Sequence, residues 1–170
     1  MRDGGPALAR AVASIRRQTF RDWRLILVDD GSTDGAVERI ADRDPRILLV
    51  RQPPLGLVAA LQAAAARSDA PLIARMDADD VSHPRRFEEQ LELGGDIVAT
   101  RVRARGAGEG MRLYIRWNNN VVTPEAIANS LFVESPIVHP TVLMSRSAYD
   151  RAGGYRDPGW AEDYDQPGSR

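Results

Sequence analysis

The 170-residue chain contains no cysteine, so disulfide bonds and thiolate chemistry are excluded. It also contains no lysine, because all 23 of its basic residues are arginine. The missing lysine excludes a phosphate-binding loop of the G-x-x-x-x-G-K type and any Schiff-base mechanism. Positive charge in a functional site must therefore come from arginine, a metal ion or the N-terminus of a helix.

A strong net charge and long apolar runs are absent as well. The net charge of −1 argues against a general nucleic-acid-binding protein. No stretch resembles a signal peptide or reaches the length of a transmembrane helix, which makes the cytoplasm the expected location. Hydrophobic residues make up 43% of the chain and charged residues 28%, so we expect one soluble, globular domain with its own core.

Short apolar runs alternate with helical patterns along the chain. The run at 25–28 has the continuous apolar pattern of a buried parallel strand, and further strands are predicted at 47–50, 71–76, 96–102 and 140–145. Helices are predicted at 6–18, 32–43, 56–67, 84–93, 111–117, 124–132 and 146–152. This order predicts an α/β fold with a mostly parallel sheet, in which ligands bind at the carboxyl ends of the strands.

Carboxylates follow two of the predicted strands. Asp29 and Asp30 end the first, and Asp77, Asp79 and Asp80 end the third. Two carboxylates about 4 Å apart repel by roughly 4 kcal/mol at an effective dielectric constant near 20, so such clusters need a cation, an arginine or water. Because the ends of parallel strands meet at one edge of a sheet, we expect the two clusters to share one crevice.

The spacing of the second cluster leaves alternatives open. In an extended chain Asp77 and Asp79 lie about 7 Å apart, too far to share one Mg²⁺ or Mn²⁺ with bonds of about 2.1 Å. One carboxylate would then hold the metal and another a ribose hydroxyl or a water, whereas a turn would let two reach the ion. The structural alternative is a loop in which Asp80 or Ser82 caps the next helix. For Asp29 the alternative is an ordinary strand-to-helix turn.

Three stretches together resemble a family-two glycosyltransferase with the GT-A fold. They are SIRRQTFRDWRLILVDDGSTD (14–34), GLVAALQAAAARSDAPLIARMDADDVSHPRRFEEQ (56–90), and FVESPIVHPTVLMSRSAYDRAGGY with AEDYD (132–155 and 161–165). They occur in the family's order and cover most of residues 5–165. The resemblance implies a GT-A-type nucleotide-sugar-binding fold, with a nucleotide-binding half at 1–104 and an acceptor half at 105–170.

The resemblance also implies a role for each acidic group. The residues expected to bind the nucleotide are Asp29, Asp30, Arg75, Asp77 and Asp79. Asp79 and Asp80 are expected to ligate Mg²⁺ or Mn²⁺, and Asp163 matches the family's catalytic base. The implied reaction is an inverting transfer of a sugar, from a donor that is UDP-linked by expectation, to a hydroxyl of a saccharide or lipid-linked saccharide. Envelope or surface polysaccharide synthesis is the implied process, with peripheral association at the inner face of the membrane as an option.

Both ends of the chain differ from the family's pattern. The family opens with an apolar strand and a Pro-x-x-Asn/Asp turn, whereas this chain opens with MRDGG. The acidic base is normally followed by an apolar helix, whereas QPGSR follows here. We therefore expect a truncated domain that lacks the first strand and the C-terminal elements, with weak or no turnover because catalytic groups need firm support.

Other classes of function compete with the transferase. A catalytically dead nucleotide-sugar-binding module predicts metal-dependent UDP binding without transfer. A phospho-signalling receiver domain also places aspartates at strand ends around Mg²⁺, but receivers use a lysine that this chain lacks. A nucleotidyltransferase, the weakest alternative, would release pyrophosphate.

Overall fold

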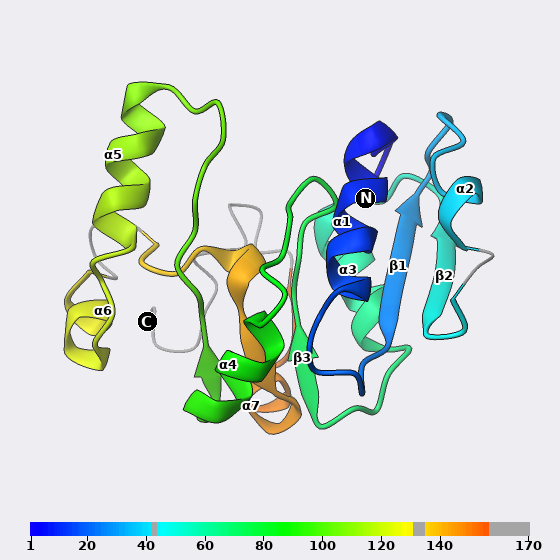
Figure 1. The fold of residues 1–170 in the computed structure, drawn as a ribbon. Helices are drawn as coiled ribbons and strands as arrows, with labels where there is room; N and C mark the ends of the chain where they lie inside the picture. Colours follow the sequence, from blue (N-terminus) through cyan, green and yellow to red (C-terminus); the bar gives the residue numbers. More distant parts are fainter. Residues whose placement is uncertain (42–43, 131–134, 157–170) are drawn as a thin grey trace.

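The computed structural model describes residues 1–41, 44–130 and 135–156 (Figure 1). In chain order its elements are α1 (Gly5–Arg16), β1 (Leu25–Asp30), α2 (Glu38–Ala41), β2 (Ile47–Gln52), α3 (Leu57–Ala65), β3 (Leu72–Ala74), α4 (Arg86–Leu93), β4 (Ile97–Val98), α5 (Glu109–Asn118), α6 (Pro124–Ser130), a 3₁₀ turn at His139–Thr141, β5 (Leu143–Ser145) and α7 (Arg146–Arg151). The α/β class predicted from the alternating patterns is therefore confirmed.

The strands form two sheets. β1 and β2 pair in parallel, from Leu25 opposite Ile47 to Asp30 opposite Gln52. In the second sheet, of order β3-β5-β4, the central strand β5 runs antiparallel to both of its neighbours. The expectation of a parallel sheet holds for β1 and β2 but not for β3, because an apolar run predicts that a strand forms and not which strand it pairs with.

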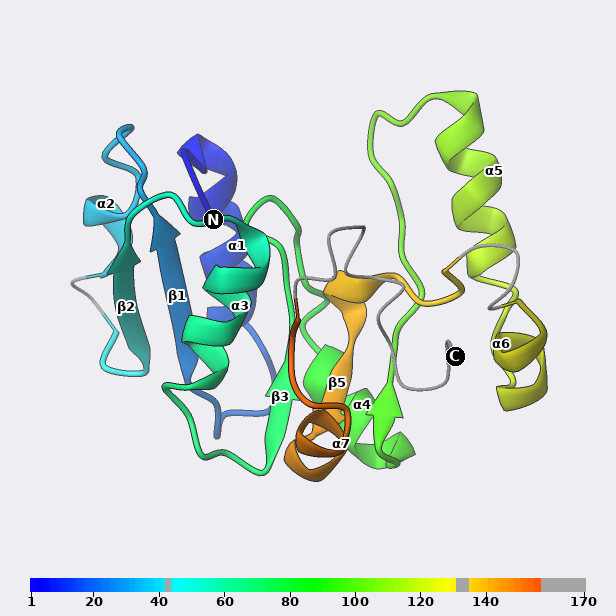
Figure 2. The ribbon, with the colours of Figure 1, turned by 180° about the vertical axis from the view of Figure 1, so that it is seen from behind.

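The core lies on both faces of β1. Leu27 packs with Leu8 and Val12 of α1, while its neighbour Val28 packs with Ala60 of α3 on the other face. Successive side chains of a strand point to opposite faces, so a strand covered on both sides needs an unbroken apolar run. Figure 2 shows α1 and α3 on opposite sides of β1 and β2.

Several predicted elements are shorter than the sequence pattern indicated, and the helix at 32–43 and the strand at 96–102 differ most. The helix predicted at 32–43 is wrong for its first half, since α2 begins only at Glu38. Gly35 adopts a positive φ of 64°, and the Asp34 carboxylate accepts a hydrogen bond from the Ala36 N–H, so the chain turns here before a helix forms. The strand predicted at 96–102 is reduced to β4.

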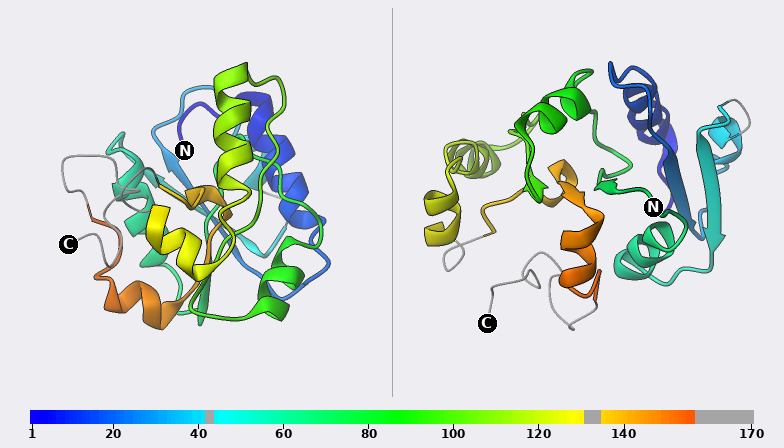
Figure 3. Two further views of the ribbon diagram at one scale, coloured as in Figure 1. Left: turned by 90° about the vertical axis from the view of Figure 1, so that its left-hand side faces the viewer. Right: turned by 90° about the horizontal axis from the view of Figure 1, so that it is seen from below.

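The α5 and α6 helices stand at the end of the molecule remote from β1 and β2 (Figure 3). The segment between β4 and α5 has little regular structure, and the predicted division at 104/105 falls within it. That division stays a prediction. In the part of the chain that the structure describes, no helix combines the length and apolar character needed to cross a membrane.

Candidate functional site

Asp29 and Asp30 lie at the carboxyl end of β1, where both are buried. Asp29 accepts a hydrogen bond through Oδ1 from the Ser32 N–H, at 2.9 Å. This bond closes the turn that follows the strand, as expected for the structural alternative. Both carboxylates are thus presented by a turn whose shape the chain itself fixes.

Asp30 holds a second loop as well. Its carboxylate accepts hydrogen bonds from Gln52 Nε2 at 2.7 Å, from the Leu55 N–H at 2.9 Å and from the Gly56 N–H at 3.0 Å. Burial alone would raise the pKa of Asp30, but these three donors together lower it. Asp30 therefore remains charged and ties the end of β1 to the loop that leads into α3.

The first residues of the chain lie against this turn and are hydrogen-bonded to it. The Met1 amine donates to the Val28 carbonyl at 2.8 Å, and the Met1 carbonyl accepts from the Asp30 N–H at 2.7 Å. Asp3 continues the contact, since its N–H donates to Ser32 Oγ at 2.9 Å. The opening segment and the acidic turn after β1 are therefore held together.

The second acidic cluster begins with an ion pair at the end of β3. The guanidinium of Arg75 is only 6% exposed, and its Nη2 lies 2.9 Å from Oδ1 of Asp77. Its Nη1 also donates to Oδ2 of the same carboxylate, at 3.3 Å. A two-point contact of this kind fixes both position and orientation. Arg75, which was expected to bind the nucleotide, thus pairs with a carboxylate of its own chain.

The chain turns immediately after Asp77, which decides between the two spacings considered above. The Asp80 N–H donates to the Asp77 carbonyl at 3.3 Å, and Asp79 and Asp80 are exposed. Partial loss of water around Asp80, and then the charges of Asp77 and Asp79, raise its pKa. The turn therefore carries negative charge that the chain does not fully compensate, which is the condition a bound cation would relieve.

Polar contacts anchor the acidic turn to α1. Ser82 is buried, and its N–H donates to Ser14 Oγ at 3.0 Å. Gln18 donates from Nε2 to Ser82 Oγ at 3.1 Å and to the His83 carbonyl at 2.7 Å. In addition, Ala78 packs against the core cluster that contains Leu27 of β1. The two acidic clusters, predicted to share a crevice, accordingly lie against one core although their strands belong to different sheets.

The donor set suits a cation that brings other ligands with it. Within residues 1–41, 44–130 and 135–156, no three His, Cys, Asp or Glu side chains are grouped so as to hold a metal ion by themselves. Mg²⁺ sites commonly use one or two carboxylates together with phosphate oxygens and water. Asp79 and Asp80, exposed on one turn, fit that requirement.

The predicted base and two buried polar residues that were not predicted also belong to the description of the site. Asp163, the predicted base, lies outside the described residues. Sequence reasoning missed Gln18 and Arg86, two buried polar residues that position the acidic turn. The signal for Gln18 was available, since it extends the spacing of Leu8, Val12 and Ile15 on the buried face of α1.

Comparison with known proteins identifies the family. The family described as Glycosyl transferase family 2 matches residues 2–153. The chain belongs to glycosyl transferase family 2. This assignment confirms the resemblance drawn from the three motifs, and it favours a transferase over a receiver domain or a nucleotidyltransferase.

Relatives with assigned names are consistent with the family. The protein named "Putative glycosyltransferase EpsE" of Bacillus subtilis (strain 168) is 32% identical over 161 residues, covering 88% of this chain and 55% of EpsE. The amylovoran biosynthesis glycosyltransferase AmsE of Erwinia amylovora is 27% identical over 167 residues, covering 92% of this chain and 61% of AmsE. The chain thus spans little more than half the length of these relatives.

Solved structures share the fold at low sequence identity. S. aureus TarS 1–349 in complex with UDP-GlcNAc aligns with a TM-score of 0.71 at 14% identity, covering 96% of this chain and 49% of that one. The mannosyltransferase PcManGT from Pyrobaculum calidifontis, in complex with GDP-Man and Mn²⁺, aligns with a TM-score of 0.65 at 21% identity, covering 94% and 46%. These likenesses confirm the GT-A fold.

Proposed function

We propose that this chain carries the donor site of an inverting glycosyltransferase, which transfers a sugar from a UDP-linked donor to an acceptor hydroxyl. The observation that carries the proposal is the exposed turn with Asp79 and Asp80, beside the Arg75–Asp77 ion pair and against the same core as the end of β1. The acceptor is a saccharide or lipid-linked saccharide of a surface polysaccharide, in keeping with the amylovoran biosynthesis named for AmsE.

Each group at the site has a distinct role in the proposal. Asp29 and Asp30 border the pocket for the base, at the turn that Ser32 closes. Asp77, oriented by Arg75, and Asp79 contact the nucleotide, while Asp79 and Asp80 hold Mg²⁺ or Mn²⁺. When bound, the cation supplies Lewis-acid stabilisation of the charge that develops on the leaving diphosphate. The UDP-GlcNAc of the TarS complex and the GDP-Man and Mn²⁺ of the PcManGT complex support this use of the site.

The proposed chemistry needs one proton acceptor. Asp163, assigned by the resemblance, takes the proton of the acceptor hydroxyl as its oxygen attacks the anomeric carbon. A single displacement of this kind breaks the bond to the diphosphate and inverts the anomeric configuration. A second carboxylate nucleophile, which a retaining double displacement uses, is not required.

Calorimetric titration of UDP into the folded chain, with and without Mn²⁺, tests the donor site. We expect UDP to bind only in the presence of Mn²⁺, and we expect Asp79→Asn to weaken that binding at least about tenfold. Asp69→Asn is the matched control, because Asp69 is an exposed aspartate just before β3, at the opposite end of the strand. A folded chain that takes up no UDP with Mn²⁺ would show that the proposal is wrong.

Transfer and binding are separated by a second variant. Asp163→Asn is expected to abolish release of UDP from a UDP-sugar in the presence of an acceptor while UDP affinity stays the same. If the unaltered chain binds UDP with Mn²⁺ but turns over no donor in a panel of UDP-sugars and acceptors, the chain is a binding module and the catalytic part of the proposal fails.

A further inference from the structure

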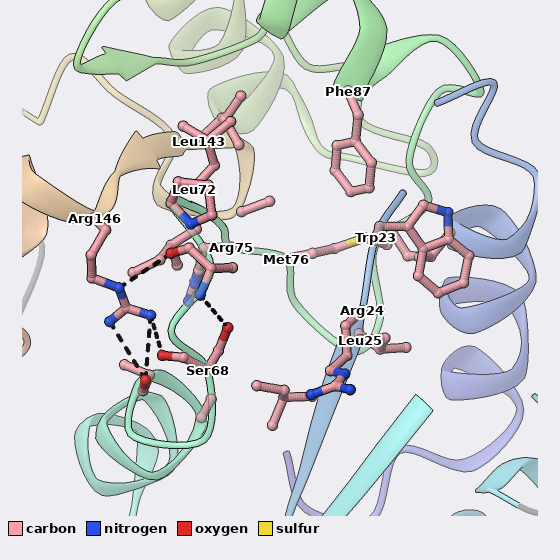
Figure 4. A pocket seen from close by; sticks show the side chains of 18 of the residues that line it. Trp23, Arg24, Leu25, Ser68, Leu72, Arg75, Met76, Phe87, Leu143 and Arg146 are labelled. Atoms are coloured by element: carbon pink, nitrogen blue, oxygen red, sulfur yellow. Dashed lines mark hydrogen bonds between the residues drawn. The ribbon is translucent and has the colours of Figure 1, made fainter. Parts of the chain in front are cut away.

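Two of the arginines that line the pocket beside β1 and β3 are bound by their own chain (Figure 4). The guanidinium of Arg146 donates from Nη2 to the Ser68 carbonyl at 2.6 Å. Arg75 forms its ion pair with Asp77. These guanidinium groups are therefore occupied within the molecule, and they are not available to attract a charged partner.

The arginines around α5 differ from these, because they are exposed and gathered in one part of the chain. Residues 101–130 contain five arginines and two glutamates, a net charge of +3 in a chain whose net charge is −1. Figure 3 shows α5 and α6 at the end of the molecule remote from β1 and β2. Positive charge therefore collects at one end of the molecule, where it raises the local concentration of anionic groups. The five arginines, all exposed, are Arg101, Arg103, Arg105, Arg112 and Arg116.

The outer face of α5 joins some of these charges to apolar side chains. Arg112 and Arg116 are four residues apart and so lie on one face of the helix, and neither has an ion-pair partner among the described residues. Met111 and Leu113 flank Arg112 at about 100° to either side, and they are 54% and 55% exposed. Asn118 lies on the other face and is buried. The exposed face of α5 thus combines two positive charges with an apolar side chain on either side of them.

The segment that leads into α5 brings two more arginines to the same end of the molecule. Its Val102 N–H donates to Asn119 Oδ1, and Asn119 Nδ2 donates to the Val102 carbonyl, both at 2.9 Å. From this point the segment runs beside α5 to the start of the helix (Figures 1 and 2). It carries the exposed Arg103 and Arg105. Val122, which is 54% exposed between α5 and α6, adds a third apolar side chain at this end.

We propose that α5 and the segment before it dock on the surface of a bilayer that contains anionic phospholipid. Negative head groups complement the exposed arginines. Arginine stems can lie along an apolar interface while the guanidinium groups stay with the phosphates, so Met111 and Leu113 can enter the head-group region beside them. A soluble polyanion would match the charge but leave these apolar side chains in water, and a second copy would set like charges against each other at a two-fold contact. The inference rests on this surface and does not depend on the proposed function.

Co-sedimentation with lipid vesicles gives the first test. The unaltered chain is expected to bind vesicles that contain phosphatidylglycerol but not vesicles of phosphatidylcholine alone, and less tightly as salt is raised. Because each arginine near an anionic surface contributes about fivefold, Arg112→Gln combined with Arg116→Gln should weaken binding at least about tenfold. Arg10→Gln combined with Arg67→Gln is the control, since both residues are exposed elsewhere, on α1 and after α3. An unaltered chain that does not bind, or equal losses in the two double variants, would overturn the proposal.

Substitution of an apolar residue gives the second test. Leu113→Gln is expected to weaken vesicle binding at least about threefold, whereas Leu93→Gln, at a residue 76% exposed at the end of α4, should leave it unchanged. Equal binding by the two variants, or complete release from vesicles by soluble polyphosphate at equal phosphate concentration, would assign the surface to a soluble polyanion and overturn the proposal. A dimeric mass that Arg112→Gln abolishes would assign it to a second copy, with the same consequence. UDP binding with Mn²⁺ is expected to stay the same in every variant, so the two proposals can fail separately.

Discussion

At the scale of single residues, the carboxylates of the site divide according to what compensates their charge. Asp30 receives three hydrogen-bond donors from the loop that it holds, and its pKa is lowered. Asp80 is partly removed from water and stands next to two other carboxylates, and both effects raise its pKa. The first arrangement stabilises the fold, whereas the second is tolerated on an exposed turn and is suited to a cation.

Because the pKa of Asp80 is raised, we expect removal of its carboxylate to have opposite effects on the stability of the chain and on its binding of UDP. Since the folded chain holds this proton more tightly than the unfolded chain does, the contribution of Asp80 to stability falls as the pH rises through its folded pKa, above the ordinary 3.8. Asp80→Asn should therefore raise the unfolding temperature of the metal-free chain at pH 7 and weaken Mn²⁺-dependent UDP binding at least about tenfold. Thermal unfolding and calorimetry check the two effects, and a variant that loses both stability and affinity would contradict the assignment.

Asp30 predicts the reverse dependence on pH. Its folded pKa lies below 3.8, so its stabilisation is present above that value and is lost as the pH falls through the folded pKa. Asp30→Asn keeps the size of the side chain, but its NH₂ group would face N–H donors that now bond to a carboxylate oxygen. The substitution should therefore cost about 1–3 kcal/mol of unfolding free energy at pH 7. Urea unfolding measures this loss. The exposed Asp150 supplies the control, since Asp150→Asn should leave the urea midpoint unchanged.

At the scale of elements, α4 fastens the second sheet through buried polar side chains. Arg86 donates from Nη2 to the Arg75 carbonyl at 2.9 Å and to the Val142 carbonyl at 3.2 Å. Gln90 donates from Nε2 to the Val98 carbonyl at 2.7 Å and to the Thr141 carbonyl at 2.9 Å. Burial lowers the pKa of Arg86 to about 10, which leaves it charged at neutral pH. One helix thereby holds the ends of β3, β4 and β5.

Removal of the Gln90 amide is expected to loosen this whole unit. Gln90→Leu leaves two buried carbonyls and the Arg86 Nε–H without their partner, so we expect a loss of about 2–4 kcal/mol in unfolding free energy. Glu92→Leu, on the exposed side of the same helix, controls for the change to leucine. Chemical unfolding of the two variants compares them, and equal stability would show that the buried amide has no such role.

The elements also show what sequence reasoning reached and where it stopped. Apolar runs at 25–28 and 47–50 predicted β1 and β2 correctly, because burial on both faces forces such runs. The partner of β3 was not predictable, since pairing depends on contacts with β5 about seventy residues away. The helix expected at 32–43 is wrong for its first half, because the Asp34 carboxylate accepts a hydrogen bond from the Ala36 N–H and Gly35 adopts a positive φ, which together compete with helix formation there.

The sequence predicted which types of residue form the candidate site, but not most of the contacts that hold them. The strand-end carboxylates marked it, and Arg75 could be placed beside a carboxylate by adjacency alone. The spacing of Gln18 indicates only that it is buried, and Gln90 carries no motif, because any buried polar side chain serves if its partners are in reach. Such partners come from tertiary packing.

At the scale of the whole molecule, the two sheets depend on a few polar links on the α1 side. Gln18 is fully buried, donates to Ser82 and His83, and accepts from the Phe87 N–H at 3.1 Å. Thr19 adds a bond from its N–H to the Pro84 carbonyl at 2.8 Å. Because the first sheet bears one acidic cluster and the second sheet the other, these links also set the relation between the two halves of the site.

Gln18→Met should therefore reduce both stability and nucleotide affinity. The substitution keeps the volume but removes one acceptor and two donor contacts from a buried position, for a loss of about 2–4 kcal/mol. Gln62→Met is the matched control, since Gln62 is exposed and its side chain donates a hydrogen bond to the Tyr155 carbonyl. We expect faster hydrogen exchange at Ser82 and Phe87 in Gln18→Met alone, together with weaker binding of UDP and Mn²⁺. Unchanged exchange at these two amides would contradict this role of Gln18, since it would show that other contacts hold the acidic turn to α1.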